Sequence, residues 1–198
     1  MLKLLGRATS GNVQKVIFLL EELGSPYERE DYGRQFNNTQ TPEYGKLNPT
    51  RKVPTLVDGD VAVWESHAIL RYLATKAKSP LYPTDPAKRS QVDRWMDWGL
   101  ASLNPVFLAG FREAKKEPAE RRAGVGDEIS AELKILEGEL SQHPYVAGDS
   151  LTIADMALAP LVSRCLNFPL GLPKFPALEA WRARLKERPA FAKATAAG

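Results

Sequence analysis

The chain has 198 residues, 43% of them hydrophobic and 26% charged, which is ordinary for a globular protein of one large domain or two small ones. Its net charge of +3 does not indicate a nucleic-acid partner, because Lys and Arg alternate with Asp and Glu, as in KKEPAERRAGVGDE, instead of forming a basic stripe. No apolar run approaches the roughly 20 residues that cross a bilayer. The apolar stretch within the N-terminal MLKLLGRATSGN is too short for a secretory signal. We therefore expect a cytoplasmic protein without a membrane partner.

The beginning of the chain predicts a strand, a helix and a second strand. Residues 2–5 (LKLL) are a short apolar run, and residues 13–23 repeat apolar side chains at helical spacing. YEREDY, residues 27–32, alternates its side chains in the way of a half-buried strand. A βαβ unit of this kind implies parallel strands joined by a right-handed crossover.

A hairpin and a further helix are predicted next. Residues 33–47 are polar and indicate an irregular loop with one helical turn. PTLV and DVAV then flank Asp58-Gly59, a strong signal for a tight antiparallel hairpin. Residues 66–76 follow with an apolar helical face. The order βαβ-ββα predicts a mixed sheet of four strands with helices.

The rest of the chain predicts only helices. SPLYPTDP, from residue 79, holds three prolines and has no periodicity, which indicates a linker. Amphipathic patterns beyond it predict helices over four ranges: 87–117, 120–141, 152–166 and 176–188. We therefore predict an α/β domain over residues 1–78, a linker over 79–85 and an all-helical domain over 86–198.

Four motifs in this order resemble those of the cytosolic glutathione transferases, in particular their bacterial theta- and beta-related branches. They are Ser10-Gly11-Asn12 at the first helix, Val53-Pro54-Thr55-Leu56 before the hairpin, Glu65-Ser66 at the third helix, and the AGDSLTIAD stretch that ends at Asp155. The resemblance covers the whole chain and implies a thioredoxin-like glutathione-binding domain followed by a helical electrophile-binding domain. Thr152 and Asp155 in the last motif form a capping-box pattern, for which we expect a role in folding.

Pro54 interrupts a strand-like run, although proline cannot complete a central strand ladder. An edge-strand proline that prevents aggregation is one explanation. The resemblance implies another, a cis Val53–Pro54 bond that turns the Val53 N–H and C=O outward. The cysteinyl backbone of glutathione would then pair with Val53 as an added strand.

Glu65 and Ser66 stand at the start of a predicted helix, whose free N–H groups favour an anion. Ser66 alone would be explained as an N-cap. The resemblance implies that Ser66 binds the α-carboxylate of the γ-glutamyl residue and that Glu65 pairs with its α-ammonium group. Lys52, with Arg51 as its competitor, is the candidate for the glycine carboxylate.

Ser10 is the candidate catalytic residue, since it matches the family's serine position. In such enzymes the nucleophile is the glutathione thiol, and only the thiolate is strongly nucleophilic. A hydroxyl hydrogen bond to sulfur at a helix N-terminus favours the thiolate. Thr9 and Asn12 are the alternative groups, and Ser10 as a plain N-cap is the structural alternative. Asn38 and Gln40 lie where the family places further contacts to the glycine end.

The sequence departs from the family pattern in three ways. Many relatives have a proline after the serine region, where this chain has Asn12-Val13, and no tyrosine precedes Tyr27. The single cysteine, Cys165, lies in the helical half, so we expect a core residue and no cysteine-based disulfide chemistry. The only histidines, His67 and His143, lack partners at ligand spacing, so we predict no metal site.

These observations together predict a glutathione transferase that conjugates glutathione, its co-substrate, to a small apolar electrophile. Trp98, Phe107 and Phe111 are candidates for the electrophile pocket, together with Leu103 on the same predicted helix and Phe168 near the end of another, although each is also explained as a core residue. The alternatives are a glutathione-binding carrier without catalysis, or another glutathione-dependent reaction such as peroxide reduction, isomerisation or dehalogenation. The resemblance also implies a homodimer, for which Phe36 and Tyr44 are expected as exposed apolar residues.

Overall fold

The structure, a computed structural model, describes residues 1–197 and divides into two compact units. The first contains residues 1–83 together with the C-terminal segment from Glu187, and the second contains Thr84–Lys186. The first unit holds β1 (Leu2–Leu5), α1 (Gly11–Glu22), β2 (Tyr27–Glu30), α2 (Pro42–Leu47), β3 (Thr55–Asp58), β4 (Val61–Trp64), α3 (Ser66–Lys76) and α9 (Pro189–Thr195). The second holds α4 (Pro86–Trp98), α5 (Asn104–Glu113), α6 (Val125–Leu140), α7 (Ile153–Cys165) and α8 (Pro176–Lys186).

A four-stranded mixed sheet in the order β2-β1-β3-β4 forms the centre of the first unit. β1 and β2 are parallel, as the βαβ pattern predicts, whereas β3 is antiparallel to both β1 and β4. Leu4 faces Leu56 across the ladder, and both are fully buried. Gly59 adopts a φ of 60° in the turn between β3 and β4, a conformation that glycine takes without steric cost. The predicted fold class, a thioredoxin-like sheet domain followed by helices, is confirmed.

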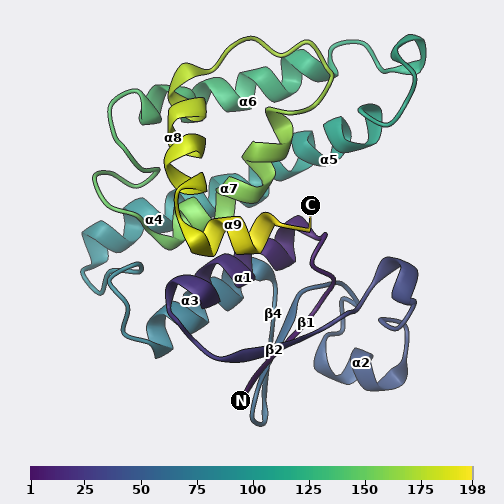
Figure 1. The fold of residues 1–198 in the computed structure, drawn as a ribbon, viewed down its shortest axis with the longest axis vertical. Helices are drawn as coiled ribbons and strands as arrows, with labels where there is room; N and C mark the ends of the chain where they lie inside the picture. Colours follow the sequence, from purple (N-terminus) through teal and green to yellow (C-terminus); the bar gives the residue numbers. More distant parts are fainter. Residues whose placement is uncertain (198) are drawn as a thin grey trace. The chain divides into compact units, whose positions relative to one another are not determined.

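Helices cover both faces of the sheet. Figure 1 shows α1 and α3 on one side and α2 on the other. Helix α2 lies inside the polar stretch predicted as a loop with one helical turn, and its start is capped by the Thr41 side chain. Contrary to the sequence-based expectation, Tyr44 on α2 is only 2% exposed, because its ring stacks on Tyr32 with the ring centroids 5.1 Å apart.

The C-terminal segment packs on α1, within the first unit. Phe191 of α9 contacts Phe18 with ring centroids 5.2 Å apart, and Arg188 forms a bidentate ion pair with Glu22 at 2.5 and 2.7 Å. Helix α1 is therefore buried on nearly all sides, between α3 and α9. The sequence pattern had assigned this segment to the helical domain, because an Ala-rich tail carries little amphipathic signal.

The second unit consists of helices, and in the described part of the chain no strand follows β4. The predicted helix 87–117 is interrupted, because a π-helical turn over Gly99–Leu103 separates α4 from α5 and α5 ends at Glu113. Glu113 accepts hydrogen bonds from Lys116 Nζ and the Arg122 N–H, each at 2.8 Å, and so closes the loop after α5. Helix α6 starts at Val125, later than predicted, after Gly124 with a φ of 78°.

The predicted capping box at the start of α7 is present. Asp155 Oδ2 accepts the Thr152 N–H at 2.9 Å, and Oδ1 accepts the Val146 N–H and the Trp181 Nε1–H, also at 2.9 Å. The Asp155 side chain is fully buried, and burial raises the pKa of its carboxyl, although each of these hydrogen bonds acts to lower it. Asp155 thereby joins α7, α8 and the preceding loop.

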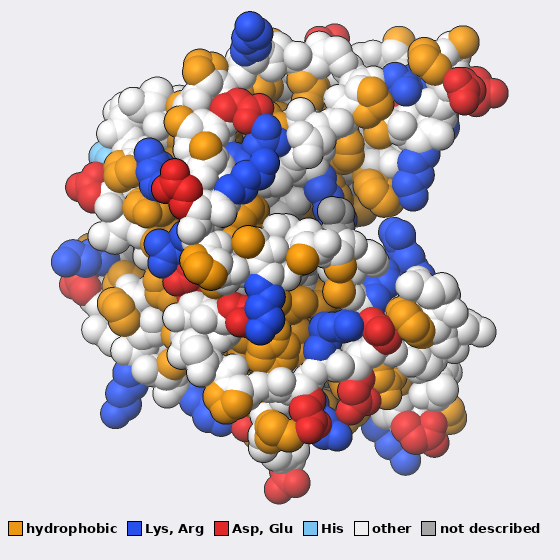
Figure 2. Space-filling model, in the orientation of Figure 1, with side chains coloured by type: hydrophobic (Ala, Val, Ile, Leu, Met, Phe, Trp, Pro, Cys, Tyr) orange, Lys and Arg blue, Asp and Glu red, His pale blue; other side chains and the backbone are white. Residues whose placement is uncertain are grey.

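The surface carries both signs of charge. Figure 2 shows Lys and Arg side chains interspersed with Asp and Glu over the face in view, as the sequence pattern indicates. Among the described residues, no helix has the length and apolar character needed to cross a membrane.

Candidate functional site

Ser10 occupies the N-cap position of α1, immediately after β1 and its loop. Its backbone is extended, with φ −80° and ψ 123°, and its carbonyl accepts the Gln14 N–H at 2.9 Å. The side chain makes no capping hydrogen bond, although it is only 9% exposed. The plain N-cap explanation therefore does not account for Ser10, and its hydroxyl remains available beside the positive end of a 12-residue helix.

Glu65 and Ser66 connect β4 to α3 through an unusual backbone conformation. Glu65 has a φ of 67°, in the left-handed region that residues other than glycine seldom adopt. Its side chain is exposed and does not cap the helix. Ser66 follows as the first residue of α3 and is 3% exposed. The turn thus places a carboxylate directly before the free N–H groups of a helix N-terminus.

Asn12 meets Ser66 from the neighbouring helix. The Ser66 hydroxyl donates to Asn12 Oδ1 at 3.5 Å, which brings the first turns of α1 and α3 together. The structure thus gives Asn12 a contact to α3, whereas the Ser10 side chain has no capping partner. Thr9, the other alternative, is exposed.

Val53 precedes a cis bond to Pro54, as the resemblance implies. Within residues 1–197, the Val53 N–H and C=O form no hydrogen bond with backbone or side chains. An extended peptide can pair with such free backbone groups beside β3. Pro54 itself is buried.

A buried polar network holds the chain on both sides of Val53 and Pro54. The Tyr44 hydroxyl donates to the Lys52 carbonyl at 2.6 Å and is hydrogen-bonded to Thr55 Oγ1 at 2.9 Å. Asn48 Nδ2 donates to the Lys52 carbonyl and to Thr55 Oγ1, at 2.9 and 3.0 Å. Burial raises the pKa of Tyr44, which keeps the hydroxyl protonated as a donor. No local sequence pattern predicts this network, since Tyr44 and Asn48 lie in or beside a polar, loop-like stretch and Thr55 lies in a predicted strand.

The two cations before Val53 differ in their contacts. Arg51 Nη1 donates to the carbonyls of Thr39 and Thr41 at 3.4 and 3.0 Å, so its guanidinium holds the preceding loop. The Lys52 side chain is exposed, and no ion pair of its ammonium group occurs among the described residues. This favours Lys52 over Arg51 as the group that meets an anionic ligand.

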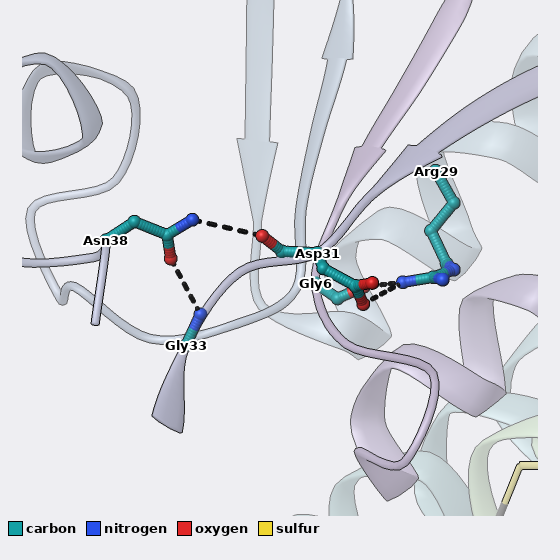
Figure 3. A network of polar contacts seen from close by, with 5 residues as sticks. All are labelled: Gly6, Arg29, Asp31, Gly33 and Asn38. Atoms are coloured by element: carbon teal, nitrogen blue, oxygen red, sulfur yellow. Dashed lines mark hydrogen bonds and ion pairs between the residues drawn. The ribbon is translucent and has the colours of Figure 1, made fainter. Parts of the chain in front are cut away.

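Asn38 has a structural role that the sequence analysis did not anticipate. Its amide donates to the Asp31 carbonyl and accepts the Gly33 N–H, both at 3.0 Å (Figure 3). Asp31 also pairs with Arg29, whose Nη1 reaches the Gly6 carbonyl at 2.9 Å. Gln40 is exposed, and its amide donates to Oγ1 of its neighbour Thr39 at 3.5 Å. Glycine-end contacts by Asn38 and Gln40 stay predictions.

A buried Lys15–His67 pair lies one helical turn beyond Asn12 along α1. Lys15 Nζ is 3.1 Å from His67 Nε2, and each residue is only 1% exposed. Burial lowers the pKa of Lys15 to about 7, partly offset by the carboxylate of Glu65, which raises it. Nothing in the local sequence pattern connects His67 with Lys15, so the pattern does not predict this contact.

The aromatic candidates of the second unit fall into two groups. Phe107 stacks on Phe111 and on Phe168, with ring centroids 6.0 and 5.9 Å apart. Trp98 instead packs edge-on against Trp95 and donates to Glu132 Oε2 at 3.2 Å. A cavity of about 590 Å³ is lined by Phe168 and Phe175, but not by Trp98, Phe107 or Phe111. The assignment of these three residues to an electrophile pocket stays a prediction.

Cys165 is a fully buried core residue, and burial raises the pKa of its thiol to about 12. A thiol with so high a pKa is not a nucleophile at neutral pH. The His143 ring lies 3.4 Å from the exposed Asp149 carboxylate, measured from Nδ1 to Oδ1. In residues 1–197, no cluster of three or more His, Cys, Asp or Glu side chains could hold a metal ion.

The first unit thus gathers groups that suit a small zwitterionic thiol peptide. Free backbone groups at Val53 can pair with its backbone, Glu65 and the α3 N-terminus can bind an amino-acid head group, and the Ser10 hydroxyl can donate to sulfur. A thioredoxin-like unit with these groups, followed by a helical unit, defines a class of glutathione-dependent proteins.

Comparison with known proteins agrees with this class. Two family models match: glutathione S-transferase, N-terminal domain, over residues 1–75, and glutathione S-transferase, C-terminal domain, over residues 96–189. Glutathione S-transferase GstB of Escherichia coli (strain K12) is 36% identical over an alignment of 203 positions, which covers 98% of this chain and 97% of that protein. The chain belongs to the glutathione S-transferase family.

Solved structures of glutathione transferases are also similar to this chain. The theta class glutathione S-transferase from Xanthomonas axonopodis pv. citri, with glutathione bound, is 36% identical with a TM-score of 0.93, covering 100% of this chain and 98% of that one. A glutathione transferase family member from Pseudomonas fluorescens pf-5, with two glutathione bound, is 28% identical with a TM-score of 0.87, covering 98% and 92%.

Proposed function

We propose that this protein conjugates glutathione to small apolar electrophiles and that Ser10 assists formation of the glutathione thiolate. The observation that carries the proposal is the Ser10 hydroxyl, which lies at the N-terminus of α1 without a capping hydrogen bond. Family membership and the relatives solved with glutathione bound support glutathione as the co-substrate.

The proposed binding mode uses three parts of the first unit. The cysteinyl backbone of glutathione pairs with the N–H and C=O of Val53. The α-carboxylate of the γ-glutamyl residue accepts hydrogen bonds from Ser66 and the α3 N-terminus, and Glu65 pairs with the α-ammonium group. The exposed Lys52 ammonium meets the glycine carboxylate. Each charged group of glutathione thus has a partner of opposite charge or a set of N–H donors.

The chemical task of the site is to favour the thiolate over the thiol. A free thiol has a pKa of about 8.5, and lowering it by two units requires about 2.7 kcal/mol of preferential stabilisation of the anion. One hydrogen bond from a hydroxyl to an anion contributes about 1.5–3 kcal/mol. The Ser10 O–H donates to the sulfur, the thiol proton leaves to solvent, and the thiolate attacks the electrophilic carbon. With an aryl halide the C–S bond replaces the carbon–halogen bond, and the halide ion leaves to solvent.

Two measurements test the function. Calorimetry with glutathione should show binding at one site per chain, and an assay with a general aryl halide should show conjugation that depends on the protein. Binding without conjugation by any of several electrophile classes would favour a glutathione-binding carrier. Consumption of a peroxide with glutathione, in the absence of conjugation, would favour a glutathione peroxidase. Absence of glutathione binding would refute the proposal.

A further inference from the structure

Two side-chain contacts join the N-terminal part of α1 to the first turn of α3. On α1 the two contacts are one helical turn apart. Asn12 Oδ1 accepts from the Ser66 hydroxyl at 3.5 Å, and Lys15 Nζ lies 3.1 Å from His67 Nε2. Asn12 and Lys15 share a face of α1 because residues three apart are neighbours on a helix. Ser66 and His67 are the first two residues of α3. These contacts therefore act on the turn that carries Glu65.

The Lys15–His67 pair joins two helices at a large cost in desolvation free energy. Lys15 and His67 are each 1% exposed, and removing an ammonium group from water carries a large desolvation penalty. An apolar side chain of similar volume would pack between α1 and α3 without that penalty. Buried titratable groups with strongly perturbed pKa values occur frequently at functional sites. His67 follows Glu65 and Ser66 directly in the chain, so the pair fixes the turn that carries those two residues of the candidate site.

We propose that Lys15 is a positioning residue for the glutathione site. Through its hydrogen bond to His67 it holds the first turn of α3, and with it the Glu65 carboxylate, in the orientation that receives the γ-glutamyl head group. This inference rests on the proposed function. Lys15 does not touch glutathione in this account. It acts through α3 and through the Glu65 carboxylate, whose negative charge raises the pKa of Lys15 against the larger, opposite effect of burial.

Three variants test the inference by calorimetry with glutathione, after circular dichroism and thermal unfolding have shown that each is folded. Lys15→Met and His67→Leu each remove one end of the hydrogen bond, and each should raise the Kd for glutathione about tenfold, because a displaced binding group loses most of its interaction. The double variant Lys15→Met/His67→Leu should bind glutathione no more weakly than whichever of the two single variants has the higher Kd. Gln14→Met is the matched control, since Gln14 is the adjacent residue and is equally buried at 1%; its Kd should stay within about twofold of the original.

A double-mutant cycle with Glu65→Gln separates positioning from a general structural role. If Lys15 acts through Glu65, then Lys15→Met should change the Kd by less than about twofold in the Glu65→Gln background. A folded Lys15→Met protein with unchanged affinity would overturn the inference, and so would an effect that multiplies fully with that of Glu65→Gln. If Lys15→Met does not fold, His67→Leu takes its place in the same cycle. If the unaltered protein itself does not bind glutathione, the proposed function fails; the inference fails alone when the unaltered protein binds and the folded variants bind equally well.

Discussion

Glu65 combines an exposed carboxylate with a strained backbone, and neither feature contributes to packing. Its side chain makes no capping bond, and its φ of 67° is unfavourable for any residue with a Cβ. We expect Glu65→Ala to weaken glutathione binding by about 1.5–3 kcal/mol, because a charged partner of the α-ammonium group is lost. The free energy of unfolding should change by less than about 0.5 kcal/mol, as for other exposed positions.

Calorimetry and urea unfolding of Glu65→Ala measure these two quantities separately. Ser66→Ala is the companion variant, and it should also lose more affinity than stability. An unchanged affinity in a normally folded Glu65→Ala protein would refute the assignment of Glu65 to the head group.

Lys15 should make the stability of the protein depend on pH in a defined direction. Burial lowers its pKa to about 7 from the ordinary 10.5. Between these values the unfolded chain binds one proton more than the folded chain, so the contribution of Lys15 to the free energy of unfolding rises with pH, by up to about 1.4 kcal/mol per pH unit. Below about pH 7 both states are protonated, and the full desolvation penalty opposes folding.

The difference in unfolding free energy between the unaltered protein and Lys15→Met isolates this contribution. Urea unfolding at several pH values between about 7 and 10 should show the unaltered protein gaining stability relative to the variant. A difference that stays constant over this range would show that Lys15 does not change its charge there.

Local motifs allowed part of the candidate site to be proposed from the sequence. Ser10, Val53 and Glu65 each lie at a break between a strand and a helix or before a hairpin, where the type of residue reveals the backbone role. Lys15 and His67 are 52 residues apart, and only the packing of α1 on α3 brings them together. Tyr44 was predicted to be exposed for the same reason, since no local pattern shows that α2 turns it toward Lys52 and Thr55.

At the scale of elements, the start of α7 allows a test of folding stability. A substitution there leaves the proposed catalytic and binding residues unchanged. The fully buried Asp155 carboxylate accepts hydrogen bonds from N–H groups of Val146, Thr152 and Trp181. Asp155→Asn keeps the volume but replaces one acceptor oxygen by a donor, which leaves buried N–H groups without a partner. We expect a loss of about 2–4 kcal/mol in the free energy of unfolding.

Denaturant unfolding of Asp155→Asn measures that loss, and the conjugation rate per folded molecule should be unchanged. Ser141→Ala is a control, because its exposed hydroxyl bonds only the Gly138 carbonyl, at 2.7 Å. A loss of less than about 1 kcal/mol in Asp155→Asn would mean that the buried network contributes no more than a simple cap.

The types of element were more predictable than their limits. The strands of the sheet and the main helices follow from periodicity, whereas the interruption of the predicted helix 87–117 does not. A π-helical turn keeps the apolar stripe of Gly99–Leu103 nearly continuous with its neighbours, so the sequence pattern does not reveal it. Helix α9 was missed because its stabilisation comes from α1, through Phe18 and Glu22.

At the scale of the whole molecule we expect a homodimer in the cytoplasm. The chain has a mass of 21.9 kDa, and several large apolar side chains are exposed, among them Phe36 at 40% and Trp64 at 37%. Apolar side chains of this size are common at subunit interfaces. Light scattering at micromolar concentration should give about twice the mass of the chain, whereas a mass near that of one chain would contradict the expectation.

The central claim is that the first unit binds glutathione and that Ser10 lowers the pKa of its thiol. The ultraviolet absorbance of the thiolate, followed by pH titration of the protein–glutathione complex, measures this pKa directly. The account predicts a value well below the roughly 8.5 of a free thiol. In Ser10→Ala it predicts a rise of about one to two units with nearly unchanged affinity, since one hydrogen bond to an anion is lost. A pKa that rises instead in Asn12→Ala would assign activation to the amide, and a bound thiol that titrates like free glutathione in the unaltered protein would contradict the account.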